Sequence, residues 1–296
     1  MPTHSAKRQT SLLALGLLLG FCACAPSPSP TNPVPAVTIV NKGSDTMVNL
    51  ALAWAEAYHA ARPSVNLSVT GGGSGTGIAA LVNRTVDLAN ASRAIKPEER
   101  AEAESRGVDS IEHVVARDAI AVIVHRDNPV QQLTLQQISD IYSGKINRWS
   151  EVGGLDKPIV RLSRETNSGT HVYFLEQVLR LGNPDDRTLF AADTLLLPSS
   201  EGITTELGYN ENAIGYDGLG YVTDAVRVLA IARSSQGPYT RPSAETVNND
   251  TYPISRDLYM YSAGQAEGEI LAYLQWILSP EGQAIVADLG FVPVGG

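Results

Sequence analysis

The chain has only two cysteines among its 296 residues, Cys22 and Cys24, and none after them. Two cysteines one residue apart cannot link distant parts of a fold, so the pattern excludes a disulfide scaffold and a cysteine-based zinc site. Basic residues are also few, with 22 Lys and Arg against 31 Asp and Glu and a formal net charge of −9. Because nucleic-acid-binding proteins usually carry a basic stripe, the composition predicts no nucleic-acid partner.

Long hydrophobic runs are scarce as well. The run near the start of the chain covers only residues 12–21, whereas a membrane-spanning helix needs roughly 20 apolar residues. Lys7 and Arg8 precede this run and small residues follow it, an order that is typical of a secretory signal. Residues 25–35 contain five prolines, which favours an extended tether over a packed element.

The end of this signal resembles that of a bacterial lipoprotein, in which a cysteine becomes the lipidated first residue. Cys24 follows the small residue Ala23, whereas Cys22 follows the bulky Phe21, so we assign the lipid to Cys24. We therefore predict a lipoprotein signal peptide over residues 1–24 and a proline-rich tether over residues 25–36. The protein is expected to be exported and anchored to the membrane, in the periplasm or at the cell surface. Cleavage near Ala25 without a lipid is the alternative.

From residue 37 onward, segments with strand and helix patterns alternate. The expected strands cover residues 37–40, 65–70, 86–89, 119–125, 159–163 and 258–261. The expected helices cover residues 45–61, 78–83, 97–106, 133–142, 169–181, 267–278 and 280–289, and we expect Ser44 or Asp45 to cap the first of them. This alternation predicts an α/β architecture with a mostly parallel sheet.

Three segments share one design, in which a strand leads through glycine and small hydroxyl residues into a helix. They cover residues 42–46, 71–77 and 164–170. The start of a helix offers unpaired N–H groups and the positive end of the dipole, and glycine lets the backbone come close to a ligand. Arg164 adds a planar, permanently charged fork that suits a tetrahedral oxyanion. Each segment alone fits an ordinary capped helix, but the three together favour an oxyanion site.

Nucleotide and hydrolase motifs do not fit these segments. A P-loop requires lysine after its second glycine, but Ile78 follows Gly77. Residues 75–80 match a loose dinucleotide fingerprint, yet the acidic residue expected about 20 positions later falls near Glu98, in a charged helical run. Ser74 is not the nucleophile of a Gly-x-Ser-x-Gly motif, because threonine replaces the second glycine.

Taken in order, these segments resemble the periplasmic phosphate-binding proteins of ABC phosphate transporters. The resemblance covers residues 37–294. It rests on Gly-Ser-Asp-Thr-Met at 43–47, Gly-Gly-Gly-Ser-Gly-Thr-Gly-Ile at 71–78, Asp-Leu-Ala-Asn-Ala-Ser-Arg at 87–93, Ile-Tyr-Ser-Gly-Lys-Ile-Asn-Arg-Trp at 141–149, Arg164 with Ser-Gly-Thr at 168–170, Ile-Gly-Tyr-Asp-Gly-Leu-Gly-Tyr at 214–221, and Ser-Pro-Glu-Gly-Gln at 279–283.

The resemblance implies a two-lobe periplasmic-binding-protein fold of type II, with phosphate enclosed between the lobes and a hinge joining them. It places lobe 1 at residues 36–118 and 255–296 and lobe 2 at residues 119–254. It also implies a monomeric, non-enzymatic binding protein, without cofactor or metal, that delivers inorganic phosphate to an ABC permease in the inner membrane. The phosphate-binding residues that it implies are Ser44, Asp45, Thr46, Ser74, Gly75, Ser92, Arg93, Arg164, Ser168, Gly169 and Thr170.

Position 93 departs from some members of that family, in which an aspartate accepts the phosphate proton. Arg93 is then either an anion ligand, which we favour, or the partner of Asp87. Asp45 is the only carboxylate inside the matched loops of lobe 1. We therefore predict that Asp45 accepts the proton and lets the protein refuse sulfate, which has no proton to offer. The alternative is that Asp45 only caps a helix.

The sequence alone leaves two other functions possible. A receptor for sulfate, molybdate or tungstate would use the same kind of site, but a sulfate site needs donors only. A secreted serine hydrolase would use Ser74 or Ser168 with His171. That interpretation lacks an acidic third member in the motif.

Overall fold

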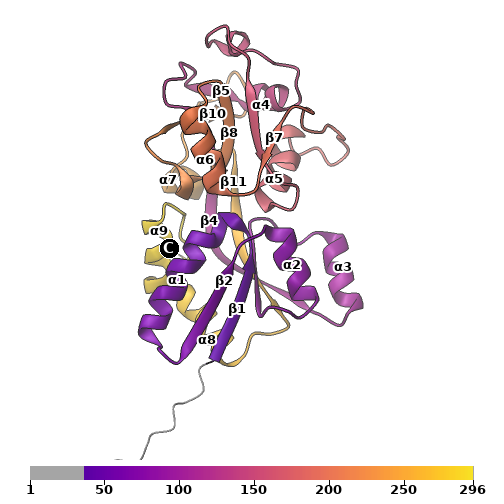
Figure 1. The fold of residues 1–296 in the computed structure, drawn as a ribbon, viewed down its shortest axis with the longest axis vertical. Helices are drawn as coiled ribbons and strands as arrows, with labels where there is room; N and C mark the ends of the chain where they lie inside the picture. The colour runs from indigo at the N-terminus through magenta and orange to yellow at the C-terminus, as the bar shows by residue number, and fades with distance from the viewer. Residues whose placement is uncertain (1–36, 296) are drawn as a thin grey trace, which may run out of the picture. The chain divides into compact units, whose positions relative to one another are not determined.

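A nine-stranded sheet runs through residues 37–295, the part of the chain that this computed structural model describes (Figure 1). Its strand order is β2-β1-β3-β11-β4-β8-β6-β7, with β9 paired to β4, and a separate two-stranded sheet joins β10 to β5. The strands are β1 (Val37–Gly43), β2 (Val65–Thr70), β3 (Leu88–Ala91), β4 (Ser110–His125), β5 (Gln132–Thr134), β6 (Val160–Arg164), β7 (Leu195–Leu197), β8 (Ala213–Gly218), β9 (Val226–Val228), β10 (Ala230–Ala232) and β11 (Ser255–Ala263).

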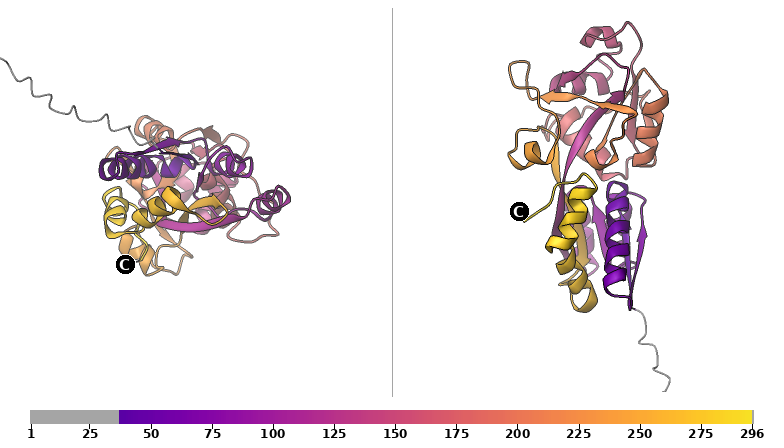
Figure 2. Two further views of the ribbon diagram at one scale, coloured as in Figure 1. Left: turned by 90° about the horizontal axis from the view of Figure 1, so that it is seen from below. Right: turned by 90° about the vertical axis from the view of Figure 1, so that its left-hand side faces the viewer.

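Helices flank this sheet in two groups (Figures 1 and 2). With β1–β3 lie α1 (Val48–Ala61), α2 (Ser74–Val82), α3 (Pro97–Ser105), α8 (Gly268–Ile277) and α9 (Pro280–Asp288). With β5–β10 lie α4 (Leu135–Tyr142), α5 (Gly169–Phe174), α6 (Ser200–Tyr209) and α7 (Ala244–Asn248). Four short helical segments complete the chain: η1 (Asp45–Met47), η2 (Trp149–Val152), η3 (Leu175–Leu179) and η4 (Leu219–Tyr221). We call the first group lobe 1 and the second lobe 2.

Strand direction differs between the lobes and the strands that join them. Within lobe 1, β1 pairs in parallel with β2 and β3, and within lobe 2, β6 pairs in parallel with β7 and β8. The central strands β4 and β11 are instead antiparallel to each other and to their other neighbours, which are β8 and β9 for β4 and β3 for β11. The expected α/β architecture is therefore present, and every antiparallel pair of this sheet includes β4 or β11.

The hydrophobic core changes over along these central strands. On β4, Val115 and Ala116 pack with the lobe 1 residues around Trp54, whereas Ile120 packs with the lobe 2 residues around Phe174. Tyr252 and Ile254, just before β11, join the lobe 2 cluster, while Leu258 on β11 joins the lobe 1 cluster. Each lobe thus has its own apolar core, and β4 and β11 carry the chain from one core to the other.

Several elements differ from the sequence-based predictions. The helix expected at 45–61 is divided into η1 and α1, and neither Ser44 nor Asp45 makes a side-chain capping bond there, so the predicted cap is wrong. The strand expected at 119–125 begins at Ser110, because β11 pairs along its earlier half. The predicted signal peptide, Cys24 and tether lie outside the described residues. None of the helices in residues 37–295 has the length and apolar character needed to cross a bilayer.

Candidate anion-binding site

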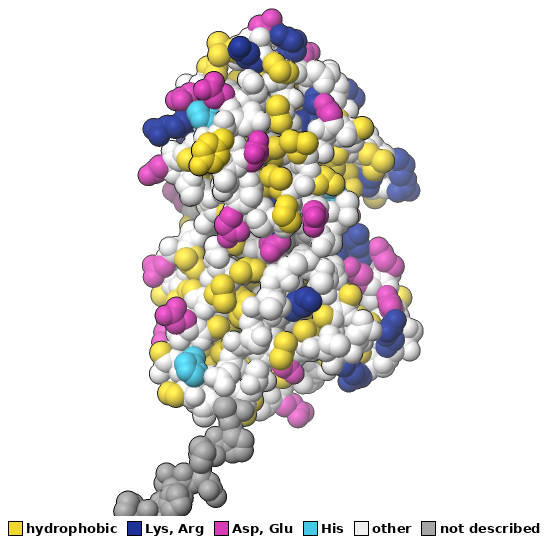
Figure 3. Space-filling model, viewed as in Figure 1, with side chains coloured by type: hydrophobic (Ala, Val, Ile, Leu, Met, Phe, Trp, Pro, Cys, Tyr) yellow, Lys and Arg dark blue, Asp and Glu magenta, His cyan; other side chains and the backbone are white. Residues whose placement is uncertain are grey.

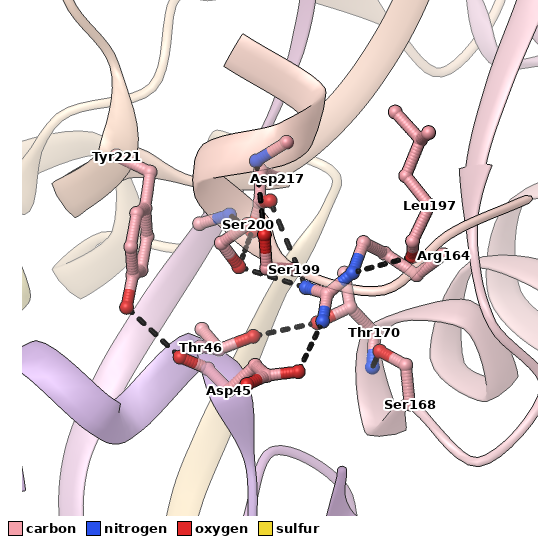
Figure 4. A network of polar contacts seen from close by, with 12 residues as sticks. Asp45, Thr46, Arg164, Ser168, Thr170, Leu197, Ser199, Ser200, Asp217 and Tyr221 are labelled. Atoms are coloured by element: carbon pink, nitrogen blue, oxygen red, sulfur yellow. Dashed lines mark hydrogen bonds and ion pairs between the residues drawn. The ribbon is translucent and has the colours of Figure 1, made fainter. Parts of the chain in front are cut away.

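Loops from both lobes meet at one place, near the ends of β1, β2 and β6. Thr46 lies in η1 directly after β1, and Thr170 lies in the first turn of α5 after β6. Their hydroxyl oxygens are 2.8 Å apart although the residues are 124 positions apart, and both side chains are buried (Figure 4). Within each lobe the parallel strands bring their carboxyl ends to one edge, and β1 and β6 run in opposite directions, so the carboxyl edges of the two lobes face each other. Glycine and hydroxyl loops that are distant in sequence therefore converge here.

A second pair of hydroxyls lies beside Gly169. The backbone N–H of Ser92 donates to Ser74 Oγ at 3.0 Å, and the two Oγ atoms are 3.3 Å apart. A Cβ atom added to Gly169 would overlap Ser74 Oγ and come within 2.6 Å of Ser92 Oγ. Gly75 N also donates to Asn167 O at 3.1 Å. Lobe 1 and lobe 2 therefore approach so closely here that only glycine fits at position 169.

Arg164, at the end of β6, is 1% exposed and almost fully engaged by protein groups. Its Nη2 donates to Asp45 Oδ2 of lobe 1 at 2.7 Å, and its Nη1 donates to Ser200 Oγ at 2.8 Å (Figure 4). The carbonyls of Leu197 and Pro198 accept from its Nε and Nη2 at 3.3 and 2.9 Å. Arg164 therefore forms an ion pair that joins the two lobes.

Burial dominates the acid–base properties of the carboxyls around Arg164. Desolvation raises the pKa of Asp45, against the opposing effects of Arg164 and of a hydrogen bond from the backbone of Gly72. Asp217, which is fully buried, has Oδ2 3.8 Å from Arg164 Nη1, and desolvation raises its pKa to about 6 although Arg164 opposes the shift. Ser200 Oγ and the N–H of Gly218 donate to its other oxygen at 2.9 and 2.7 Å.

A second buried arginine, Arg256, enters the same region from β11. It forms an ion pair with Asp118 of β4 at 2.9 Å, and both side chains are at most 2% exposed. Its Nη2 also donates to Thr170 Oγ1 at 3.0 Å and approaches Thr46 Oγ1 at 3.5 Å, while its Nη1 donates to the carbonyl of Ser92. No motif in the sequence marks Arg256 as a site residue.

The chain matches the profile of the PBP superfamily domain over residues 27–281. It is 33% identical over 270 residues to the phosphate-binding protein PstS of Pseudomonas aeruginosa, covering 85% of this chain and 81% of that protein. It is 30% identical to the Bacillus subtilis PstS, covering 85% of this chain and 79% of that protein. The chain belongs to the PstS family of phosphate-binding proteins.

The fold of this PstS-family chain also matches solved structures. A putative phosphate ABC transporter substrate-binding protein from Clostridium perfringens, determined with bound phosphate, is similar with a TM-score of 0.78 and 33% identity, covering 87% of this chain and all of that one. An ABC-type phosphate transport receptor from Vibrio cholerae gives 0.67 and 25% identity, covering 86% of this chain and 99% of that one. The expected two-lobe periplasmic-binding-protein fold is therefore confirmed.

Arg93 does not pair with Asp87, so that alternative is wrong. Its two Nη atoms donate to the carboxylate of Glu99 at 2.7 and 2.6 Å, while Asp87 accepts from the backbone of Val40. The side chain of Arg93 is 8% exposed and its Nε makes no hydrogen bond with the described residues. It lines a cavity of about 480 Å³ that also borders Arg256. This cavity lies between lobe 1 and lobe 2, because residues 93–97 line it from lobe 1 and residues 172–173 and 176–177 line it from lobe 2.

Serine positions in this PstS-family chain differ in what they contact. Ser168 Oγ caps α5 by accepting from the N–H groups of Thr170 and His171 at 3.2 and 3.4 Å. Ser44 Oγ is buried and has no hydrogen-bond partner among the described residues. The ring of His171 contacts Ser163 Oγ at 3.1 Å, and burial lowers its pKa. His171 therefore does not form the serine–histidine pair that a hydrolase would need with Ser74 or Ser168.

Proposed function

We propose that the protein captures inorganic phosphate between lobe 1 and lobe 2 and delivers it to the permease of an ABC importer. The observation that supports this most strongly is the meeting of Thr46, Ser74 and Ser92 from lobe 1 with Gly169 and Thr170 from lobe 2, beside two buried arginines. A buried oxyanion needs many donors, and hydrogen bonds to charged groups contribute about 1.5–3 kcal/mol each. Hydroxyls, helix-start N–H groups and guanidinium groups are such donors.

We propose that phosphate is bound by the residues that the family resemblance implies. Most of these residues, including Ser44, Gly75 and Ser168, lie on the loops that converge between the lobes. Arg93 lies at the edge of this region and pairs with Glu99, which leaves its Nε as the group that could face an anion. Arg164 and Asp45 stand on opposite lobes and are paired with each other. Phosphate would therefore meet a guanidinium and a carboxylate held side by side.

That arrangement supports Asp45 as the proton acceptor. A carboxylate accepts a hydrogen bond from a phosphate hydroxyl, but it repels sulfate, which has no hydroxyl at neutral pH. Asp45 makes no capping bond, and Arg164 Nη2 fixes one of its oxygens. Selection against sulfate is then exerted by a residue whose position depends on the approach of lobe 2.

The general electrostatic field of the protein contributes little to capture. The face in Figure 3 shows acidic side chains near the level where the lobes meet, and its Lys and Arg side chains are scattered. Charges more than about 8–10 Å apart are largely screened at physiological salt. The attraction for an anion therefore comes from buried donors, which favours a small anion that fits entirely between the lobes.

Calorimetric titration of the purified protein with phosphate, arsenate, sulfate and molybdate tests this function. We expect one phosphate per chain and much weaker binding of sulfate. Tighter binding of sulfate, molybdate or tungstate would instead support a receptor for another oxyanion. Arsenate should bind nearly as well as phosphate, because it carries the same protons.

We also propose that the protein is exported, that Cys24 carries a lipid anchor, and that the monomer docks on its permease. The predicted signal and the proline-rich tether support the anchor. In cells, wild-type protein should partition into a detergent phase, whereas Cys24→Ala should stay in the aqueous phase. Cys22→Ala serves as the matched control and should behave as wild type. Partitioning of both variants like wild type would contradict the assignment to Cys24.

A further inference from the structure

Arg256 stands on the strands that join the lobes, not on either of the loops that close over the anion. It lies on β11 directly opposite Asp118 of β4 in the antiparallel register. Arg256 Nε and Nη2 both donate to Asp118 Oδ2, at 3.2 and 2.9 Å. Because the two residues are cross-strand neighbours, their ion pair depends on the β4–β11 ladder and does not require contact between the loops of lobe 1 and lobe 2.

The remaining donors of Arg256 reach both lobes. Nη1 donates to Ser92 O at 2.9 Å on lobe 1, and Nη2 donates to Thr170 Oγ1 at 3.0 Å on lobe 2. Tyr173 lies in α5 of lobe 2, and the centroid of its ring is 5.8 Å from the guanidinium carbon of Arg256. The hydroxyl of Tyr173 donates to Ser255 O at 2.6 Å. The guanidinium plane is therefore fixed from the hinge strand and from lobe 2 together.

This placement controls where the threonine hydroxyl hydrogens point. Arginine can only donate, so Thr170 must turn a lone pair towards Arg256 Nη2, and Thr46, whose hydroxyl oxygen is 3.5 Å from the same nitrogen, cannot point its hydrogen there. The two hydroxyls are 2.8 Å apart and share one hydrogen between them. Of their two hydrogens, one is used in that mutual bond, and the other is left to point away from Arg256 towards another acceptor. An anion between the lobes is the acceptor that this arrangement suits.

We infer that Arg256 is a positioning residue for phosphate, which orients the hydroxyl donors of Thr46 and Thr170 and is itself held in place by Asp118. The inference rests on the proposed function. It adds a residue that lies on β11 of the hinge, outside the glycine and hydroxyl loops. Asp118 balances the charge of Arg256 and fixes the position of its side chain. Arg256 therefore contributes donors and positive charge for the anion, whereas Asp118 does not.

Phosphate titration of the full chain separates these roles. Arg256→Gln should weaken phosphate binding at least about tenfold, because the donor to Thr170 and the positive charge are both lost. Asp118→Asn should lower the melting temperature but leave phosphate binding at least as tight as in wild type, because Arg256 keeps its charge. A purely structural pair would weaken binding in both variants alike, and that result would overturn the inference.

The neighbouring rung of the same ladder supplies the control. Arg117 on β4 lies opposite Asp257 on β11, with 3.5 Å between Nε and Oδ1, and both side chains are partly exposed. Arg117→Gln should leave phosphate affinity within about twofold of wild type. If Arg256→Gln fails to fold, Arg256→Lys provides the test, because lysine keeps the positive charge but lacks the planar guanidinium group. Weakening by about threefold or more supports the inference, and wild-type affinity overturns it.

A double-mutant cycle measures the coupling between Arg256 and Thr170 in phosphate affinity, which a general loss of stability would not change. If Arg256 acts through Thr170, then Thr170→Val should cost much less affinity in the Arg256→Gln background than in wild type. Additive losses would contradict the inference. Failure of wild-type protein to bind phosphate would refute the proposed function instead, so the two failures are distinguishable.

Discussion

Arg164 and Arg256, two of the buried arginines of the site, are paired in different ways. Arg164 and Asp45 belong to opposite lobes and are 119 positions apart, so their ion pair exists only while the lobes are in contact. Arg256 and Asp118 face each other across β4 and β11, in one rung of a continuous ladder. The first pair belongs to the contact layer between the lobes, and the second belongs to the strands that join them.

The difference separates contacts that exist only while the two lobes touch from contacts that belong to the strands joining the lobes. We expect contacts of the first kind, including Thr46 with Thr170 and Gly75 with Asn167, to break together if the lobes move apart. We expect the hinge pair to stay in place through such a motion, because its neighbours in the ladder hold it. Changes in the contact layer should therefore alter phosphate binding with little effect on unfolding, whereas changes in the hinge pair should lower stability, and the change at Arg256 should weaken phosphate binding as well.

The largest effect is expected at Gly169, in the contact layer. In Gly169→Ala the new methyl group would meet Ser74 Oγ and Ser92 Oγ, so the lobes could not reach this arrangement. We expect phosphate affinity to fall about 100-fold, which is about 2.7 kcal/mol, with little change in the melting temperature without ligand. Gly208→Ala in α6 is the control, because its Cβ would meet only Ala225 at 3.6 Å. Equal affinities in both variants would refute the steric account.

Arg164 should give the next largest effect. Arg164→Ala is expected to weaken phosphate binding at least about tenfold, or about 1.4 kcal/mol, and Arg164→Lys should recover only part of the loss because the planar fork is gone. Calorimetry with phosphate measures both. Wild-type affinity in Arg164→Ala would remove Arg164 from the site and leave Arg256 as its principal cation.

Asp217 lies behind Arg164 and should make stability depend on pH. Its pKa is about 6 when folded, against 3.8 for the unperturbed group, so the folded state holds this proton to higher pH than the unfolded state. Its contribution to stability is complete below about pH 4 and falls as the pH rises towards 6. Asp217→Asn should remove this fall, so the melting temperature of the variant should drop by several °C less than that of wild type across that range. Parallel pH profiles for the two proteins would contradict the assignment.

The smallest change in phosphate affinity is expected at Asp45. Asp45→Asn should leave phosphate binding within about threefold while it lowers the phosphate-to-sulfate affinity ratio about tenfold, because an amide can donate to either anion. Titration with both anions gives the ratio. If the ratio is unchanged, the proton acceptor is another group, and the pair with Arg164 serves only to join the lobes.

Much of the site could be predicted from the sequence because its loops carry local signals. Glycine and hydroxyl residues between a strand and a helix are visible at 43–46, 71–77 and 168–170, and these loops do meet. Arg256 has no such signal, since it sits in an ordinary strand, and its partner Asp118 lies 138 positions earlier. Only the pairing of β4 with β11 brings them together.

The remaining differences also have physical causes. Nothing in the charged helical run around Glu98 distinguishes Glu99, but its side chain accepts from the N–H of Lys96 at 2.9 Å and pairs with Arg93. Such a contact depends on where α3 begins relative to β3. The elements from β7 to α7 were not predicted, because most are short and owe their existence to neighbours such as β6 and β4 rather than to a periodic pattern.

Small-angle scattering with and without phosphate tests most directly whether phosphate holds the two lobes together. The account predicts that saturating phosphate lowers the radius of gyration of wild-type protein, while sulfate at the same concentration leaves it unchanged. Arg256→Gln should need more phosphate to reach the same compact state. Unchanged dimensions in wild-type protein that calorimetry shows to be saturated with phosphate would contradict capture by closure of the lobes.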